Sequence, residues 1–200
     1  TGALSIRSFR AAGADPLAVA TVAVLTGTSE TVHPFASMDE LASRADLAKI
    51  SRALTKFDPE DIMHLSARML HQKPYDAVRD ALSVMGIVGP KAEAFWQAVR
   101  PNLEAIDQAL SWWHIVNGPI APHVRPDPAL IERARDLLPP APWDETTWST
   151  WTNAVKEATG AKGKALFMPL RLALTGVEHG PELKLLLPLI GRDEVMARFA

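Results

Sequence analysis

Three cations lie in the segment of residues 161–183, which reads AKGKALFMPLRLALTGVEHGPEL. Pro169 predicts a helix that begins near Leu166, with the proline in its first turn, and that ends at Thr175-Gly176. Lys162 and Lys164 then precede a helix N-terminus, where free amide groups and the helix dipole already favour anions. Cations in this position are explained equally well by two hypotheses, contact with a phosphate group or simple exposure to water.

The third cation, Arg171, lies inside this predicted helix. Helical spacing places one set of apolar side chains on a single face, and we expect this face to lie in the core. Arg171 projects from the edge of the face, one turn before Thr175, and we expect it to contact phosphate groups. The set comprises Leu166, Phe167, Leu170, Ala173 and Leu174.

Residues with catalytic or metal-binding chemistry are otherwise scattered. His64 and His71 are seven positions apart, which is not the one-turn spacing at which two imidazoles share a metal. No serine lies in a G-x-S-x-G or S-x-x-K motif, and no glycine-rich phosphate loop is present. The carboxylates near Asp58 crowd a helix start, where capping explains them. The sequence therefore predicts no catalytic residue and no metal site.

Tryptophans are concentrated in one part of the chain, at positions 96, 112, 113, 143, 148 and 151. Trp148 and Trp151 are one helical turn apart and should share a face, whereas the adjacent Trp112 and Trp113 point about 100° apart. Aromatic rings can stack on unpaired bases. Packing between helices is the more frequent role, and we expect it for most of the six.

Elements that position these residues are predicted to be helices throughout. Asp15-Pro16 and Asp58-Pro59 each combine an N-cap with a proline at the first helical position, and Ser37 to Glu40 has capping-box spacing. Further helix starts are indicated near residues 74, 90, 101, 128, 144 and 181. Hairpin turns of the Asn-Gly or Asp-Gly type and alternating β-branched runs are missing. The sequence predicts an all-α fold, with an extended connector over residues 118–128.

Composition limits the classes of function. The 200 residues have a net charge of -2, which argues against binding nucleic acid by global attraction, and we expect no DNA partner. Residues 151–200 nevertheless hold 7 Lys and Arg against 5 Asp and Glu, so we expect any polyanion contact to be local. The chain has no cysteine and no apolar run of about 20 residues, and we expect a cytoplasmic protein without a membrane partner.

Two separated regions resemble bacterial glutamyl-tRNA synthetases. Residues 162–183 (KGKALFMPLRLALTGVEHGPEL) are similar to the C-terminal signature of that family, and residues 186–199 resemble its final helix. Residues 1–29 are similar to the segment after the class I Lys-Met-Ser-Lys-type loop, and residues 51–68 resemble the stem-contact region. One departure is Ser66, where the family usually has an asparagine that bridges backbone groups.

The resemblance implies an all-α chain in three parts: a stem-contact region over residues 1–75, and anticodon-binding subdomains over 76–127 and 128–200. It implies tRNA-Glu as the partner and a monomer. The family reads an anticodon base with an arginine, for which Arg100 is the nearest match by position. The expected RNA-binding residues are Arg7, Arg10, Arg100, Lys162, Lys164 and Arg171.

The resemblance also implies a longer parent ligase that uses ATP and magnesium to attach glutamate to tRNA-Glu in protein synthesis. Neither signature peptide of the family's ATP-binding fold is found in these residues, so we expect no activity and no cofactor of the chain alone. Whether the parent also charges tRNA-Gln stays open. An alternative hypothesis is a helical interaction module that docks on another synthetase or on an amidotransferase.

Overall fold

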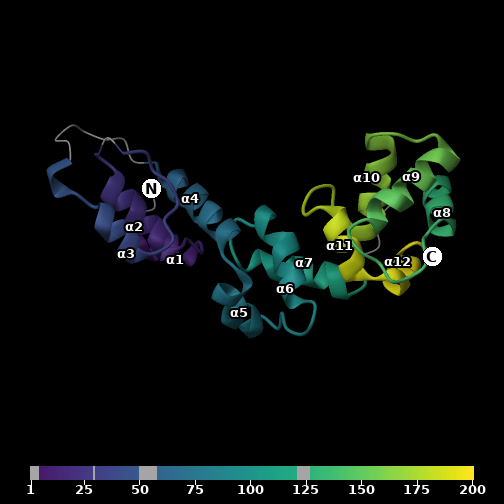
Figure 1. The fold of residues 1–200 in the computed structure, drawn as a ribbon, viewed down its shortest axis with the longest axis horizontal. Helices are drawn as coiled ribbons and strands as arrows, with labels where there is room; N and C mark the ends of the chain where they lie inside the picture. Colours follow the sequence, from purple (N-terminus) through teal and green to yellow (C-terminus); the bar gives the residue numbers. More distant parts are fainter. Residues whose placement is uncertain (1–4, 29, 50–57, 121–126) are drawn as a thin grey trace. The chain divides into compact units, whose positions relative to one another are not determined.

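Helices follow one another throughout the part of the chain that the computed structural model describes, residues 5–28, 30–49, 58–120 and 127–200 (Figure 1). No strand occurs within these residues, which confirms the predicted all-α class. The helices are α1 (Ile6–Ala11), α2 (Pro16–Leu25), α3 (Met38–Arg44), α4 (Pro59–Gln72), α5 (Tyr75–Val84), α6 (Ala92–Val99), α7 (Gln108–Asn117), α8 (Pro128–Asp136), α9 (Thr147–Thr159), α10 (Lys164–Thr175), α11 (Leu183–Ile190) and α12 (Arg192–Arg198). Short 3₁₀ helices, η1 (Leu47–Lys49) and η2 (Arg100–Asn102), complete the described elements.

The predicted helix caps are present. The Asp15 carboxylate accepts a hydrogen bond from the Leu17 amide at 2.9 Å, and Asp58 accepts one from the Glu60 amide at 3.0 Å. In both cases proline occupies the first helical turn. These caps satisfy amide groups that have no partner inside the helix, which explains why α2 and α4 begin at these residues.

The helices form two compact units. The first contains Thr1–Arg79 and Arg100–Ala109, and the second contains Asp80–Val99 and Leu110–Ala200. This grouping is interleaved along the chain, and the three-part division at residues 75/76 and 127/128 stays a prediction. Most of the predicted connector at 118–128 lies outside the described residues.

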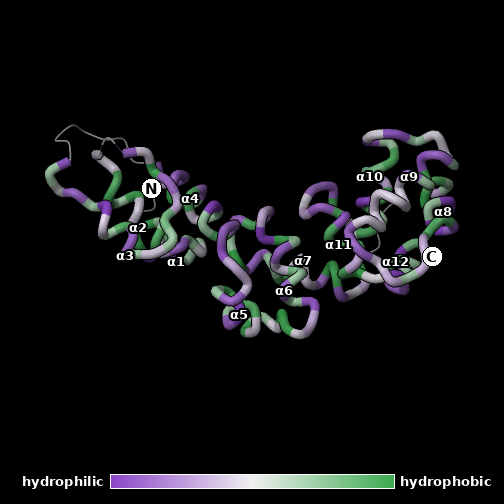
Figure 2. The backbone as a smooth tube through the Cα atoms, in the orientation of Figure 1, coloured by the Kyte–Doolittle hydropathy of each residue, from purple (hydrophilic) through white to green (hydrophobic). Residues whose placement is uncertain are grey.

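In the first unit, α2 packs against α4. The core between them includes Phe9, Val22, Ile62 and Leu65, and α2 is apolar over almost its whole length (Figure 2). The buried Ser66 hydroxyl accepts a hydrogen bond from the Asp15 amide at 2.8 Å. Serine at this position therefore does bridge to backbone, linking α4 to the start of α2.

In the second unit, α9 packs against α8 and α11, while α11 also contacts α6. Trp96 and Trp151 are fully buried in this unit, whereas the other four tryptophans are half-buried. The Trp151 indole donates a hydrogen bond to the Ala134 carbonyl at 2.9 Å, which satisfies its polar edge in the core. Packing is the main role of these two residues, as expected.

Helix α10 begins two residues earlier than predicted. Its first residue is Lys164, and Pro169 lies in its interior at the sixth position, not in the first turn. The end of the helix was predicted correctly, because Gly176 adopts a φ of 74° there. Leu166, Leu170 and Leu174 are buried as predicted.

Candidate nucleic-acid interface

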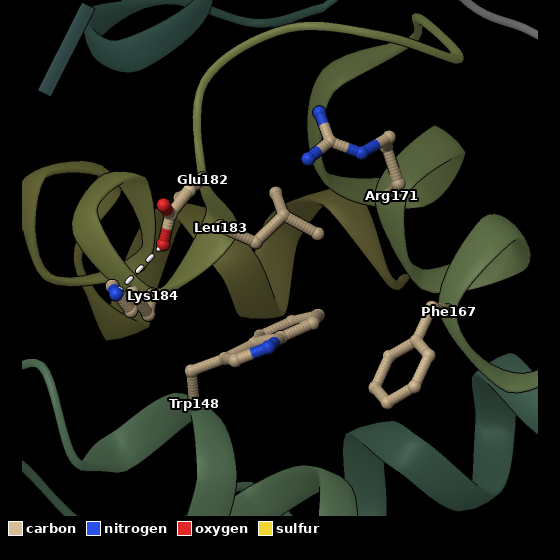
Figure 3. Close-up of a pocket in the computed structure, with 6 residues that line it drawn as sticks. All are labelled: Trp148, Phe167, Arg171, Glu182, Leu183 and Lys184. Atoms are coloured by element: carbon tan, nitrogen blue, oxygen red, sulfur yellow. Dashed lines mark ion pairs between the residues drawn. The ribbon is translucent and has the colours of Figure 1, made fainter. Parts of the chain in front are cut away.

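A pocket of 330 Å³ lies in the second unit, where helices α9, α10 and α11 meet (Figure 3). Helix α9 contributes Trp148, and α10 contributes Phe167 and Arg171. The start of α11 completes the lining with Glu182, Leu183 and Lys184. The pocket therefore brings together aromatic rings and charged groups from three helices.

Two other cavities among the described residues lack this combination. A cavity of 520 Å³ around Trp113 and His114 has no lysine or arginine in its lining. A cavity of 190 Å³ in the first unit includes Lys73 but no aromatic residue. The pocket at Trp148 is thus the candidate site in which a base could stack beside a cation.

The aromatic part of the pocket is held by the core beneath it. Trp148 packs edge-on against the buried Trp151, with ring centroids 5.7 Å apart and planes at 72°, as their spacing predicted. On its other side Trp148 contacts Phe167, with centroids 6.2 Å apart and planes at 37°. The Trp148 indole is therefore fixed in position although it is only half-buried.

Phe167 was predicted to lie in the core, and this prediction is wrong. The side chain is 44% exposed. Phe167 lies one turn before Arg171 and three residues after Lys164, so it is at the edge of the apolar face of α10, next to these cations. An exposed phenylalanine on a cationic face is a surface available for stacking.

Arg171 is the polar centre of the pocket. Its Nη2 donates a hydrogen bond to the Pro181 carbonyl at 2.9 Å, and Thr175 Oγ1 donates to the Arg171 carbonyl. The other terminal nitrogen, Nη1, is buried and has no hydrogen-bond partner among the described residues. Burial also lowers the pKa of this guanidinium, which still remains charged near neutral pH. An unpaired buried donor is costly, so the site favours a ligand that supplies an acceptor.

The start of α11 adds an exposed ion pair. Lys184 Nζ lies 2.8 Å from the Glu182 carboxylate (Figure 3), and this hydrogen bond and charge raise the pKa of Lys184. The Lys184 side chain is 47% exposed to water and the Glu182 side chain is 66% exposed. Such a pair contributes little to stability and can rearrange around a ligand.

The lysines before and within α10 are exposed, as Lys162 precedes the helix and Lys164 is its first residue. Gly163 is the N-cap and offers no side chain to accept the first amide hydrogen bonds. The structure thus places Lys164, Phe167 and Arg171 on one face of one helix. It leaves both lysine side chains outside the pocket lining.

The remaining predicted site residues belong to the first unit. Arg7 and Arg10 lie three positions apart on α1 and are exposed. Arg100 is the first residue of η2, because α6 ends at Val99, and its Nη1 donates to the Lys73 carbonyl at 2.7 Å. Arg100 is half-buried. One of its terminal nitrogens binds the carbonyl of Lys73, the residue that follows α4.

Sequence reasoning did not single out Trp148, Glu182, Leu183 or Lys184 as site residues. Only the clustering of tryptophans pointed toward Trp148, and no local pattern pointed to the start of α11. For His64 and His71 the structure offers no metal chemistry: within the described residues, no group of three potential His, Asp or Glu ligands occurs. His71 instead hydrogen-bonds to the Leu103 carbonyl at 2.8 Å. No described helix is both long and apolar enough to span a bilayer.

Comparison with known proteins agrees with this arrangement. Residues 125–200, which include the pocket, match the family model of an anticodon-binding domain. A glutamate–tRNA ligase 2 from Methylorubrum populi is 55% identical, over 100% of this chain and 44% of its own length. A glutamate–tRNA ligase 1 from Chelativorans is 51% identical, over 99% of this chain and 44% of its own length. The crystal structure of a glutamate-tRNA synthetase from Elizabethkingia anophelis shares the fold, with a TM-score of 0.73 at 20% identity, covering 96% of this chain and 41% of that one.

The fold and the matched model thus define a helical protein that carries an anticodon-binding domain. Over nearly its whole length the chain is similar to glutamate–tRNA ligases, and it spans 44% of the length of the curated relatives it matches. These findings favour an anticodon-binding function over the alternative of a protein-interaction module.

Proposed function

We propose that this chain recognises tRNA-Glu, and that the pocket between α9, α10 and α11 binds one unpaired base of the anticodon loop. The observation that carries the proposal is the unpaired, buried Nη1 of Arg171, a residue that lines the same pocket as Trp148. Proteins read RNA sequence mainly on unstacked bases, which stack on aromatic rings and hydrogen-bond along their edges.

Binding in the pocket would use three contacts of different kinds. A base that stacks on Trp148 or Phe167 gains about 1–3 kcal/mol, whatever its identity. Arg171 Nη1 donates to an acceptor on the base edge, which distinguishes bases by the position of that acceptor. Leu183 excludes water from the apolar side of the pocket. Stacking therefore supplies affinity, and Arg171 supplies selectivity.

Phosphate contacts would come from cations outside the pocket. Lys162 and Lys164 are exposed next to the pocket-bearing helix, and Arg7 and Arg10 form a second exposed cationic pair on α1. Arg100 keeps one terminal nitrogen beyond the one bonded to Lys73, and we assign it to a second base contact. Each neutralised phosphate steepens the dependence of affinity on salt concentration.

The parent ligase, in this proposal, attaches glutamate to tRNA-Glu with ATP and magnesium during protein synthesis in the cytoplasm. The described residues contain no group that we assign to ATP or to magnesium, and adenylate formation is expected from other parts of the ligase. The chain acts as a monomer that binds RNA and not DNA.

The experiment is a titration of the chain with a fluorescent anticodon stem-loop of tRNA-Glu and with stem-loops altered at single anticodon positions. We expect Arg171→Met to weaken binding of the tRNA-Glu stem-loop about 10-fold, because the base-edge hydrogen bond is lost. The difference in affinity between this stem-loop and the altered ones should become smaller. Trp148→Leu should weaken binding of all loops alike, because stacking is insensitive to base identity.

The matched control is Arg133→Met, since Arg133 is exposed on α8 and removes the same charge without touching the pocket. Equal affinity of the unaltered chain for all stem-loops would contradict the proposal and leave only nonspecific contact. The same conclusion would follow if Arg171→Met and Arg133→Met weakened binding by the same factor.

A further inference from the structure

The loop between α10 and α11 lies directly against a tryptophan from a distant helix. Gly180 in this loop has a φ of 138°, and a Cβ atom at this position would lie only 2.1 Å from Cη2 and 2.3 Å from Cζ2 of Trp112 on α7. Real Cβ atoms do not approach other atoms so closely. The six-membered ring of Trp112 therefore occupies the space where any other residue would place its side chain.

This contact lies one residue from the hydrogen bond that orients the pocket. Pro181 follows Gly180, is buried, and accepts the hydrogen bond from Arg171 at 2.9 Å. Glu182 and Leu183, the next two residues, line the pocket. A displacement of Gly180 is thus transmitted within one peptide to the acceptor of Arg171 and then to the pocket wall.

We propose that Trp112 is a positioning residue for base recognition, which holds the loop at Gly180 so that Arg171 Nη1 faces the bound base. The inference rests on the proposed function of the pocket. Trp112 does not line the pocket and acts only through the loop. Helix α7 is thereby coupled to a base-reading group that lies on α10.

Removal of the indole leaves room for the loop to adopt other conformations. The Arg171 guanidinium then keeps its charge but loses its fixed direction. Trp112→Leu should therefore reduce the preference for the correct anticodon base about 10-fold, the range of one base-reading contact. The salt dependence of binding should stay unchanged, because the phosphate contacts of Lys162 and Lys164 do not depend on the loop.

Gly180→Ala tests the same contact from the other side. The added methyl group overlaps the indole and forces the loop outward, so the base preference should fall as it does for Trp112→Leu. In the double variant that combines Trp112→Leu with Gly180→Ala, this overlap is gone. Its loss of base preference should therefore be clearly smaller than the product of the losses in the two single variants. A residual effect from the positive φ of residue 180 will remain.

The matched control is Trp113→Leu. Trp113 is also half-buried on α7, but it packs edge-on against Phe95 with centroids 4.9 Å apart, and the atoms nearest a Cβ at Gly180 all belong to Trp112. We expect it to leave the base preference within about twofold of the unaltered chain. If Trp112→Leu and Trp113→Leu reduce the preference equally, or if the double variant shows the full product of the losses, the inference is overturned.

An RNA-free measurement separates this inference from the proposed function. Amide hydrogen exchange of residues 177–183 should be about 10-fold faster in Trp112→Leu than in the unaltered chain, at an unchanged exchange rate of the α9 core amides. Unchanged exchange in the loop would overturn the inference even if the chain selects its RNA as proposed. Faster exchange in a chain that shows no base preference would instead refute the proposed function and retain the role of Trp112 in holding the loop.

Discussion

Arg198 is the strongest test of how the second unit is held together. This arginine lies at the end of α12, and its side chain is 2% exposed. It donates hydrogen bonds to the carbonyls of Ile115 at 2.7 Å and Gly118 at 2.8 Å, and a further one to the Leu174 carbonyl. Its Nε pairs with Glu194 at 2.8 Å. One side chain thus joins the ends of α7, α10 and α12.

Replacing Arg198 by methionine fills much of the volume but leaves these acceptors without their donor. The charge left behind, Glu194, is 32% exposed and keeps contact with water, so the main cost comes from the carbonyls. Each carbonyl that loses its donor and cannot reach water costs about 1–3 kcal/mol, and Arg198 donates to the carbonyls of Ile115, Gly118 and Leu174. We therefore expect the free energy of unfolding of the second unit to fall by about 3–5 kcal/mol.

Tryptophan fluorescence measures this change selectively, because all six tryptophans of the sequence belong to the second unit. With a urea slope of about 2 kcal/mol per molar, the midpoint of the fluorescence transition should fall by about 2 M. The control is Arg133→Met, on an exposed position of α8, which should shift the midpoint by less than about 0.3 M. A shift for Arg198→Met as small as that of the control would refute the reasoning that its hydrogen bonds hold the three helix ends together.

Two further predictions concern carboxylates at helix starts. Asp15 caps α2 through the Leu17 amide and pairs with Lys73 at 2.6 Å. Asp15→Ala should therefore lower the free energy of unfolding of the first unit by about 1–2 kcal/mol, measured by circular dichroism, whereas Asp15→Asn keeps the cap and should lower it less. Equal losses in the two variants would contradict the capping role. Hydrogen bonds from the Thr146 side chain and then its amide lower the pKa of Asp144, so this carboxylate stabilises the fold above the unfolded pKa of about 3.9 and ceases to do so as pH falls through the lower folded value. The melting temperature of Asp144→Asn should therefore lie below that of the unaltered chain at pH 7 and approach it in acid, and a constant difference across this range would contradict the assignment.

Local chemistry explains why the helix starts could be predicted from sequence. Aspartate followed by proline satisfies an amide and presets φ within two residues, so the starts of α2 and α4 depend on no distant part of the chain. The start of α10 does depend on its surroundings. Pro169 was taken as a first-turn residue, yet it is tolerated in the interior of a helix whose packing outweighs one lost hydrogen bond.

The pocket could be predicted only in part, because its residues come from three helices. Arg171 was identified from its position at the edge of an apolar face, but its bond to Pro181 depends on the path of the following loop. Lys184 has no distinctive pattern in the sequence, and Trp148 stood out only as one of six tryptophans. The exposure of Phe167 is decided by which side of α10 its neighbours α8 and α12 cover, and periodicity does not determine this.

The interleaving of the two units along the chain restricts how this protein can be cut or recombined. The backbone passes from one unit to the other at residues 79/80, 99/100 and 109/110, so no single cleavage leaves both units whole. A piece that starts at residue 110 would lack α6, together with Phe95 and Trp96, which are completely buried. An exchange of gene segments would preserve the second unit only by carrying residues 80–200 together, including the ten residues that belong to its neighbour. The two units should therefore be inherited as a pair.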